Sequence, residues 1–146
     1  MNKLFKLFFK NEIFKHSNEW ALVILRIIPS FYLFYYHGFK KIIGGSGTWE
    51  WLGEAAISLL GINFGFVFFG FLAASSEGVL TWFVMMGIFT RFSSFFIFIT
   101  MFFAGLYHLV QGDSGELALI YFTIYFTIFL IGPGKFSLDY KIFRKF

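Results

Sequence analysis

The chain has 146 residues, of which 58% are hydrophobic and only 14% are charged, well below the roughly 25% charged residues of soluble domains. This composition indicates an integral membrane protein. The absence of cysteine excludes disulfides, thiolate metal sites, dithiol chemistry and iron-sulfur clusters within this chain. The net charge of +4 does not indicate nucleic-acid binding, because the basic residues gather at the ends of apolar segments.

Residues 1–19 are predicted to form a basic interfacial segment that precedes a single transmembrane domain over residues 20–146. Lys3, Lys6 and Lys10 share a narrow arc of a helix, as an anchoring helix at the membrane surface would place them. A purely topogenic role explains these lysines equally well. The segment lacks a small-residue cleavage site, so it is not expected to be a removable signal peptide.

Four apolar segments follow, and each is a candidate membrane-spanning helix. A helix needs about 20 mostly apolar residues to cross a hydrocarbon core of about 30 Å. The segments cover residues 20–43, 63–87, 92–110 and 116–131, the last with some extension. A very short link makes the second and third segments an antiparallel hairpin. The sequence therefore predicts an all-α, integral membrane four-helix bundle in contact with the lipid bilayer.

The charges in the links orient this bundle. Basic residues precede the first segment, occupy the second link and follow the fourth segment. At the opposite ends of the segments the only basic residues are Lys40 and Lys41, alongside four acidic residues: Glu50, Glu54, Asp113 and Glu116. By the positive-inside rule, both termini are predicted to be cytoplasmic, in a bacterial-type inner membrane that the chain crosses several times.

The first outer connection, GGSGTWEWLGEAAISLLGIN, begins with flexible glycines. It then has the pattern of a short amphipathic helix, with Trp49 and Trp51 at the depth of the lipid headgroups. A segment that folds back into the bundle fits the same pattern, and the sequence does not decide between the two.

Arg26 and Glu77 lie well inside the apolar segments, away from the outer ends where the other ionisable residues gather, and charges at such depth are costly and usually pair. Arg26 lies in the first segment and Glu77 in the second, and we expect them to form a buried ion pair. Such a pair has a purely structural interpretation, because it would also fix the register of the two helices.

A second polar cluster is predicted at the outer mouth of the bundle. Helical rise places His37, Lys40, His108 and Glu116 at similar depth, and Glu54 and Asp113 are close in the connections. Histidine can exchange a proton with a quinone oxygen near neutral pH, and neighbouring aromatic side chains would supply an apolar slot. Quinone is therefore the candidate ligand. No intrinsic cofactor or metal is expected. A divalent metal, a haem and simple polar packing are the alternative interpretations of the same residues.

The order and spacing of these polar residues along the four segments resemble those of the DoxX family of membrane proteins. The matching stretches are ILRIIPSFYLFYYHGFKKIIGG, SSEGVLTWFVMMGIFTRF, MFFAGLYHLVQGDSGELALIY and GPGKFSLD. The family pattern falls on Arg26, His37, Gly38, Lys40, Glu77, Thr90, Arg91, His108, Glu116, Gly132 to Gly134, Ser137 and Asp139. The resemblance implies a four-helix membrane fold. It also implies an association with quinone-linked oxidation of sulfur compounds and with terminal quinol oxidase complexes.

The favoured hypothesis is a quinone-associated or accessory subunit of a membrane oxidoreductase system, with membrane or soluble oxidoreductase subunits as partners and no catalytic set evident in the chain itself. A small-solute or proton-coupled transporter is the first alternative, with Glu77 as the relay. A non-catalytic assembly or scaffold partner is the second. Substrate and oligomeric state, including a homo-oligomer, are left open.

Overall fold

The computed structural model describes residues 17–143, and every regular element in this range is helical. The predicted basic segment over residues 1–19 therefore lies almost entirely outside the described residues. The elements are α2 (Ser17–Leu33), η1 (Phe34–Gly38), α3 (Phe39–Ile43), α4 (Gly45–Ile57), η2 (Ser58–Leu60), α5 (Phe66–Ser75), η3 (Ser76–Leu80), α6 (Thr81–Met86), α7 (Thr90–Val110), α8 (Glu116–Ile131) and α9 (Leu138–Phe143).

Three continuous helices have the length and composition to cross a membrane: Ser17–Ile43, Phe66–Met86 and Thr90–Val110. They agree closely with the first three predicted segments, and the all-α prediction is confirmed over the described residues. The fourth predicted segment is the apolar helix α8, which has 16 residues. At 1.5 Å per residue α8 is about 24 Å long, so it is shorter than a typical hydrocarbon core of about 30 Å.

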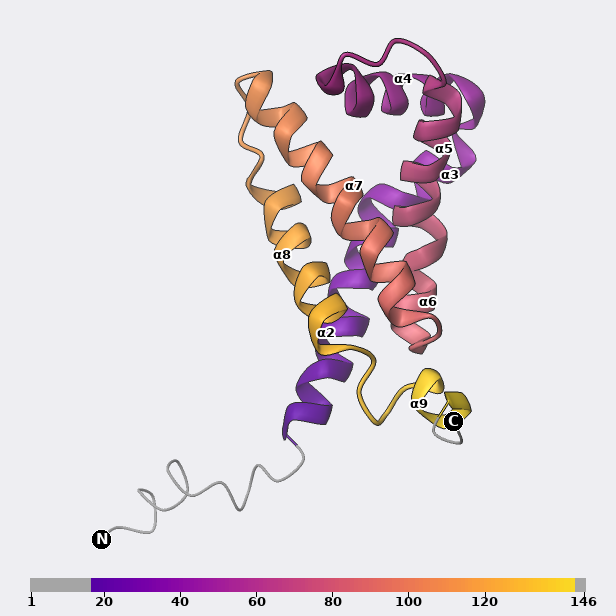
Figure 1. The fold of residues 1–146 in the computed structure, drawn as a ribbon, viewed down its shortest axis with the longest axis vertical. Coiled ribbons are helices and arrows are strands. Elements are labelled where there is room, and N and C mark those ends of the chain that lie inside the picture. The colour runs from indigo at the N-terminus through magenta and orange to yellow at the C-terminus, as the bar shows by residue number, and fades with distance from the viewer. Residues whose placement is uncertain (1–16, 144–146) are drawn as a thin grey trace, which may run out of the picture.

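The long helices run side by side along the longest axis of the molecule, with α4 lying across one end and α9 near the other (Figure 1). Their shared core is built from one residue of α2, one of α6 and three each of α7 and α8: Leu33, Val84, Ile97, Phe98, Met101, Tyr121, Tyr125 and Ile128. Large apolar side chains on the outer faces are exposed, among them Ile24, Phe68, Phe102 and Leu130. This is the distribution expected where lipid rather than water covers the outside of the helices.

Two of the long helices contain a π-helical turn, η1 in the first and η3 in the second. A π-turn inserts an extra residue into an α-helix and is frequent at functional sites. Here the two turns pack against each other. Gly38 makes this approach possible, because a Cβ at that position would overlap the backbone carbonyl of Glu77.

The first outer connection folds onto the other helices as α4. Gly53 packs against the backbone of Phe66 and Gly70 against the backbone of Trp49, so α4 and α5 approach at backbone distance. The indole Nε1 of Trp49 donates a hydrogen bond to the carbonyl oxygen of Lys41 at 3.0 Å. With these contacts α4 lies across one end of α5 and also packs against α7 (Figure 1).

Candidate functional site

The centre of the candidate site is an ion pair between α3 and η3. Lys41 Nζ lies 2.6 Å from Oε1 and 2.7 Å from Oε2 of Glu77. The Glu77 side chain is only 2% exposed, whereas the Lys41 side chain is 25% exposed. A carboxylate so deeply buried requires a compensating charge, and Lys41 supplies it through a bidentate contact.

Glycines at the contact between the two helices permit this pairing. Gly38 packs on the Glu77 carbonyl, and Gly78 packs on Gly38 and Ile42. Small residues at such crossings let helix backbones approach closely within a membrane. The close approach brings Lys41, one turn beyond His37, within reach of the carboxylate on the neighbouring helix.

Two cavities adjoin this ion pair. We call the first, of about 290 Å³, the α8-side cavity, because Leu117, Ala118 and Tyr121 of α8 line it. We call the second, of about 330 Å³, the α4-side cavity, because α4 forms one of its walls. Five residues line both cavities and therefore lie between them: His37, Lys41, Glu77, Ala104 and His108.

Both histidines of the predicted cluster line the two cavities, His37 from η1 and His108 from α7. His37 is half-buried, and His108 is exposed at the edge. His108 Nδ1 lies 3.6 Å from Oδ2 of Asp113, which forms an ion pair whenever the imidazole is protonated. The structure thus brings together two imidazoles, one ammonium group and one buried carboxylate, drawn from three of the long helices.

Three residues of the predicted cluster lie elsewhere. Lys40 is exposed and lies outside both cavities. Glu54 lines a separate groove of about 390 Å³ with Trp51 and Tyr107, and Glu116 lines a shallow groove beside Leu109. Similar depth along the helices places Lys40, Glu54 and Glu116 at the same end of the molecule as the histidines, but it does not place them in the two cavities. The lysine at the cavities is Lys41, which the sequence prediction missed in favour of Lys40; its i+4 spacing from His37 is the signal that could have identified it.

The predicted ion pair between Arg26 and Glu77 is not formed, so that prediction is wrong. The guanidinium of Arg26 is directed toward the α9 end of the molecule, where Nη2 donates to the Phe136 carbonyl at 3.1 Å and Nη1 packs against Gly87. Gly87 lies ten residues beyond Glu77, or about 15 Å along a helix. Arg26 is 2% exposed and ties the first helix to the C-terminal segment.

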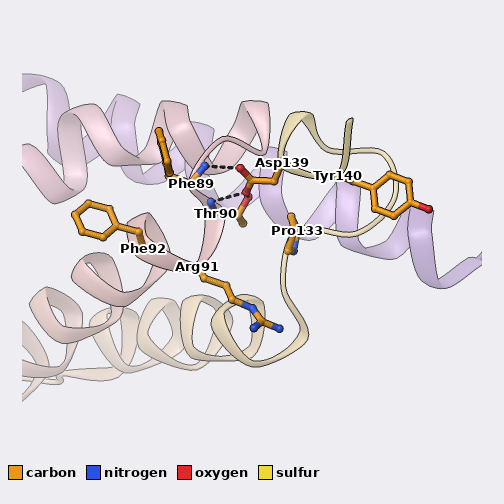
Figure 2. A pocket seen from close by; sticks show the side chains of 7 residues that line it. All are labelled: Phe89, Thr90, Arg91, Phe92, Pro133, Asp139 and Tyr140. Carbon is orange, nitrogen blue, oxygen red and sulfur yellow. Dashed lines mark hydrogen bonds between the residues drawn. The ribbon is translucent and has the colours of Figure 1, made fainter. Parts of the chain in front are cut away.

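A larger hollow, of about 580 Å³, lies at the α9 end of the molecule (Figure 2). Its carboxylate, Asp139, accepts hydrogen bonds from the backbone N–H groups of Phe89 and Thr90 at 2.7 and 2.8 Å. The Thr90 hydroxyl donates a third, at 2.7 Å. Asp139 therefore caps the start of α7 from across the chain, and its hydrogen-bonding capacity is used for structure.

Apart from Lys40 and Glu116, which lie outside both cavities, the residues of the family pattern separate into two groups. One group lies at the α9 end and holds the C-terminal segment in place: Arg26, Thr90, Arg91, Gly132 to Gly134, Ser137 and Asp139. The other lines or supports the two cavities: His37, Gly38, Glu77 and His108. Ligand chemistry is therefore expected only at the second group.

The donor set at the cavities favours an organic ligand. Within residues 17–143, no group of three or more His, Cys, Asp or Glu side chains is arranged to hold a metal ion. The α8-side cavity has apolar walls from Leu33, Met101 and Leu117, and its lining also includes polar side chains: His37, Lys41, Glu77, His108, Ser114 and Tyr121. An apolar ring with hydrogen-bonding groups matches such a lining.

Comparison with known families gives one match, to the family described as TQO small subunit DoxD, over residues 57–146. The matched region covers more than half of the chain and includes Glu77, His108 and the C-terminal segment 132–143, which we call the C-terminal clamp because Asp139 binds it to the start of α7. It confirms the resemblance to the DoxX family that the sequence motifs indicated. Neither the curated proteins nor the solved structures gave a match.

Proposed function

The chain belongs to the family of the TQO small subunit DoxD, and from this premise we propose that it is a quinone-associated accessory subunit of a membrane oxidoreductase system. The observation that carries the proposal is the buried, bidentate pair of Lys41 and Glu77 between two cavities. Buried charges inside membrane proteins are rare and usually functional. Here they coincide with two imidazoles and an apolar cavity wall.

In this proposal the quinone headgroup occupies the α8-side cavity. The Lys41 ammonium donates a hydrogen bond to a quinone oxygen, while Glu77 keeps that ammonium charged and oriented. His37, beside them, exchanges a proton with the same oxygen as the redox state of the quinone changes. Leu33, Met101 and Leu117 contact the ring, and Tyr121 closes the far side of the cavity.

The membrane arrangement is part of the same proposal. The single transmembrane domain predicted over residues 20–146 crosses the inner membrane of a bacterial-type cell with four helices, so that both ends of the domain face the cytoplasm. The basic segment predicted over residues 1–19 lies almost entirely outside the described residues. The exposed apolar outer faces of the long helices support contact with lipid or with a membrane subunit. The electrons are supplied by that partner, and this chain, which has no cysteine, contributes the quinone site.

Quinone content of the purified protein tests this proposal. The wild-type protein and two variants, Glu77→Gln and Glu50→Gln, are purified in a mild detergent, and the quinone in their lipid extracts is measured per mole of protein. Glu50 lies exposed on α4, outside both cavities, so it is the matched control. We expect quinone with the wild type and with Glu50→Gln, and at least tenfold less with Glu77→Gln.

Two results would remove the proposal. One is a wild-type protein that carries no quinone and binds none when ubiquinone or menaquinone is added. The other is equal quinone content in Glu77→Gln and Glu50→Gln, because binding would then take place away from the ion pair.

A further inference from the structure

The α4-side cavity adjoins a third hollow, which opens at the α4 end of the molecule. This outer groove, of about 390 Å³, has a polar rim that includes Glu54, Ser58 and Gln111. Trp51, Ala55 and Tyr107 line both the outer groove and the α4-side cavity. The outer groove, the α4-side cavity and the ion pair therefore adjoin one another in that order.

Two aromatic side chains lie at the boundary between the outer groove and the α4-side cavity. Trp51 extends from α4 and Tyr107 from α7, with ring centroids 6.5 Å apart and ring planes at 86°. Trp51 is 56% exposed, so its indole has room to turn away from the boundary. Tyr107 is half-buried, and Ala55, the third shared residue, is small.

The chemistry on the two sides of this boundary differs. The outer groove presents a carboxylate, an amide and a hydroxyl, which are groups that hold water. On the inner side, Glu77 is too deeply buried to exchange protons with bulk solvent directly. A carboxylate at the entrance, such as Glu54, also raises the local concentration of cations, protons included.

We infer that Trp51 and Tyr107 gate an access route by which water and protons reach the Lys41–Glu77 pair from the α4 end. The inference rests on the proposed function only for the assignment of the α8-side cavity to quinone. The protein then has two separate entrances to one ion pair: an aqueous one beneath α4, and an apolar one beside α8. Trp51 and Tyr107 are positioning residues in this scheme, because neither is assigned a contact with the quinone.

The absence of cysteine makes a direct test feasible, since every introduced thiol is the only one in the chain. Ala56→Cys places a thiol in the α4-side cavity, Ala118→Cys places one in the α8-side cavity, and Ser46→Cys places one on the exposed surface of α4. Each variant is made alone and combined with Trp51→Ala or Trp51→Phe. Labelling rates are measured with a small, positively charged methanethiosulfonate reagent.

We expect Trp51→Ala to accelerate the labelling of Ala56→Cys at least tenfold and to leave Ala118→Cys and Ser46→Cys within about twofold. Trp51→Phe, which keeps a ring at the boundary, should change the labelling of Ala56→Cys much less. Far-UV circular dichroism and the unfolding temperature of each variant establish that the fold is retained.

The gate is overturned if Ala56→Cys reacts at the same rate with and without Trp51, or does not react in either background while Ser46→Cys does. The proposed function is tested separately in the same samples, by asking whether added quinone protects Ala118→Cys from labelling. If quinone protects Ala118→Cys but the labelling of Ala56→Cys does not depend on Trp51, the gate is wrong and the quinone site stands. If the labelling of Ala56→Cys depends on Trp51 but quinone does not protect Ala118→Cys, the gate stands and the quinone site is wrong.

Discussion

Lys41 Nζ contacts both carboxylate oxygens of Glu77, at 2.6 and 2.7 Å, across the contact between two helices that each contain a π-turn. Both residues of the pair line the two cavities, so a substitution at this contact tests the stability of the fold and the proposed quinone site together. Four predictions follow from this pair and from the contacts that position the elements around it.

Removal of the Lys41 charge should destabilise the protein strongly. Lys41→Met leaves the Glu77 carboxylate buried without its partner, at an expected cost of about 3–5 kcal/mol. The free energy of unfolding in detergent is measured by denaturant titration. Lys40→Met is the matched control, since the adjacent side chain is exposed and its loss should cost no more than about 0.5 kcal/mol.

A double variant sharpens that prediction. Lys41→Met combined with Glu77→Leu removes both charges, so it should recover much of the stability that Lys41→Met alone loses. Equal stability of Lys41→Met and Lys40→Met would contradict the pairing that the structure shows.

The contact between the two π-turns should not tolerate a methyl group. In Gly38→Ala the new Cβ overlaps the Glu77 carbonyl, so the helices must separate, at a cost of about 1–3 kcal/mol. The separation also lengthens the contact between Lys41 and Glu77, so bound quinone should fall with stability. Gly47→Ala is the control, because no heavy atom lies within 4 Å of the added Cβ. The two variants are compared by thermal unfolding and by quinone content, and equal results would count against the close approach.

A comparison of two glycines separates backbone strain from steric overlap. Gly87 and Gly45 have nearly the same left-handed backbone, with φ of 70° and 72°. An alanine at either position costs about 1–2 kcal/mol for the backbone alone. At Gly87 its Cβ would also overlap the Arg26 guanidinium, whereas at Gly45 it meets nothing within 4 Å.

Gly87→Ala should therefore destabilise the protein more than Gly45→Ala, by about 1–3 kcal/mol, as expected for overpacking. Unfolding free energies of the two variants, measured in the same detergent, give this difference. A difference near zero would mean that Arg26 moves aside freely, in conflict with its burial at 2% exposure.

Loss of the Asp139 carboxylate should release the C-terminal segment. Asp139→Ala removes three hydrogen bonds at the start of α7, including the one to Phe89, whose φ of 46° is unfavourable for a residue with a side chain. The expected cost is about 1–2 kcal/mol. Hydrogen exchange followed by mass spectrometry should show faster exchange in residues 87–91 and 132–143.

Asp113→Ala is the control for that experiment, because Asp113 is 71% exposed and distant in sequence from the clamp. Exchange in residues 132–143 should then remain at the wild-type rate. Equal acceleration in both variants would show that Asp139 does not hold this segment.

Much of the fold was predictable because the physical constraint on it is local. The number of apolar residues needed to cross a bilayer depends on helix rise and hydrocarbon thickness alone. The predicted segment over residues 92–110 accordingly differs from α7 by two residues at its start. The hairpin of the second and third segments followed from the same counting, because a very short link leaves two helices no other arrangement.

The candidate site was predicted less well, because it depends on helix rotation. Depth along a helix can be counted from the sequence, and His37 and His108, which this counting places at similar depth, line the same two cavities. Which face a residue occupies depends on how the neighbouring helices pack. The π-turn in η1 changes that face locally, and the sequence pattern carried no sign of it.

Sequence alone determined that this is an all-α membrane protein of the DoxX family, because the length of the hydrophobic segments and the order of the motifs can be read along the linear sequence. The tertiary structure decided which charged side chains contact each other and which contact the backbone. Glu77 pairs with Lys41 and Arg26 with the carbonyl of Phe136, because backbone contacts at Gly38 and Gly87 set which side chains face each other across the helices. Such contacts join residues far apart in the chain, and no local pattern records them.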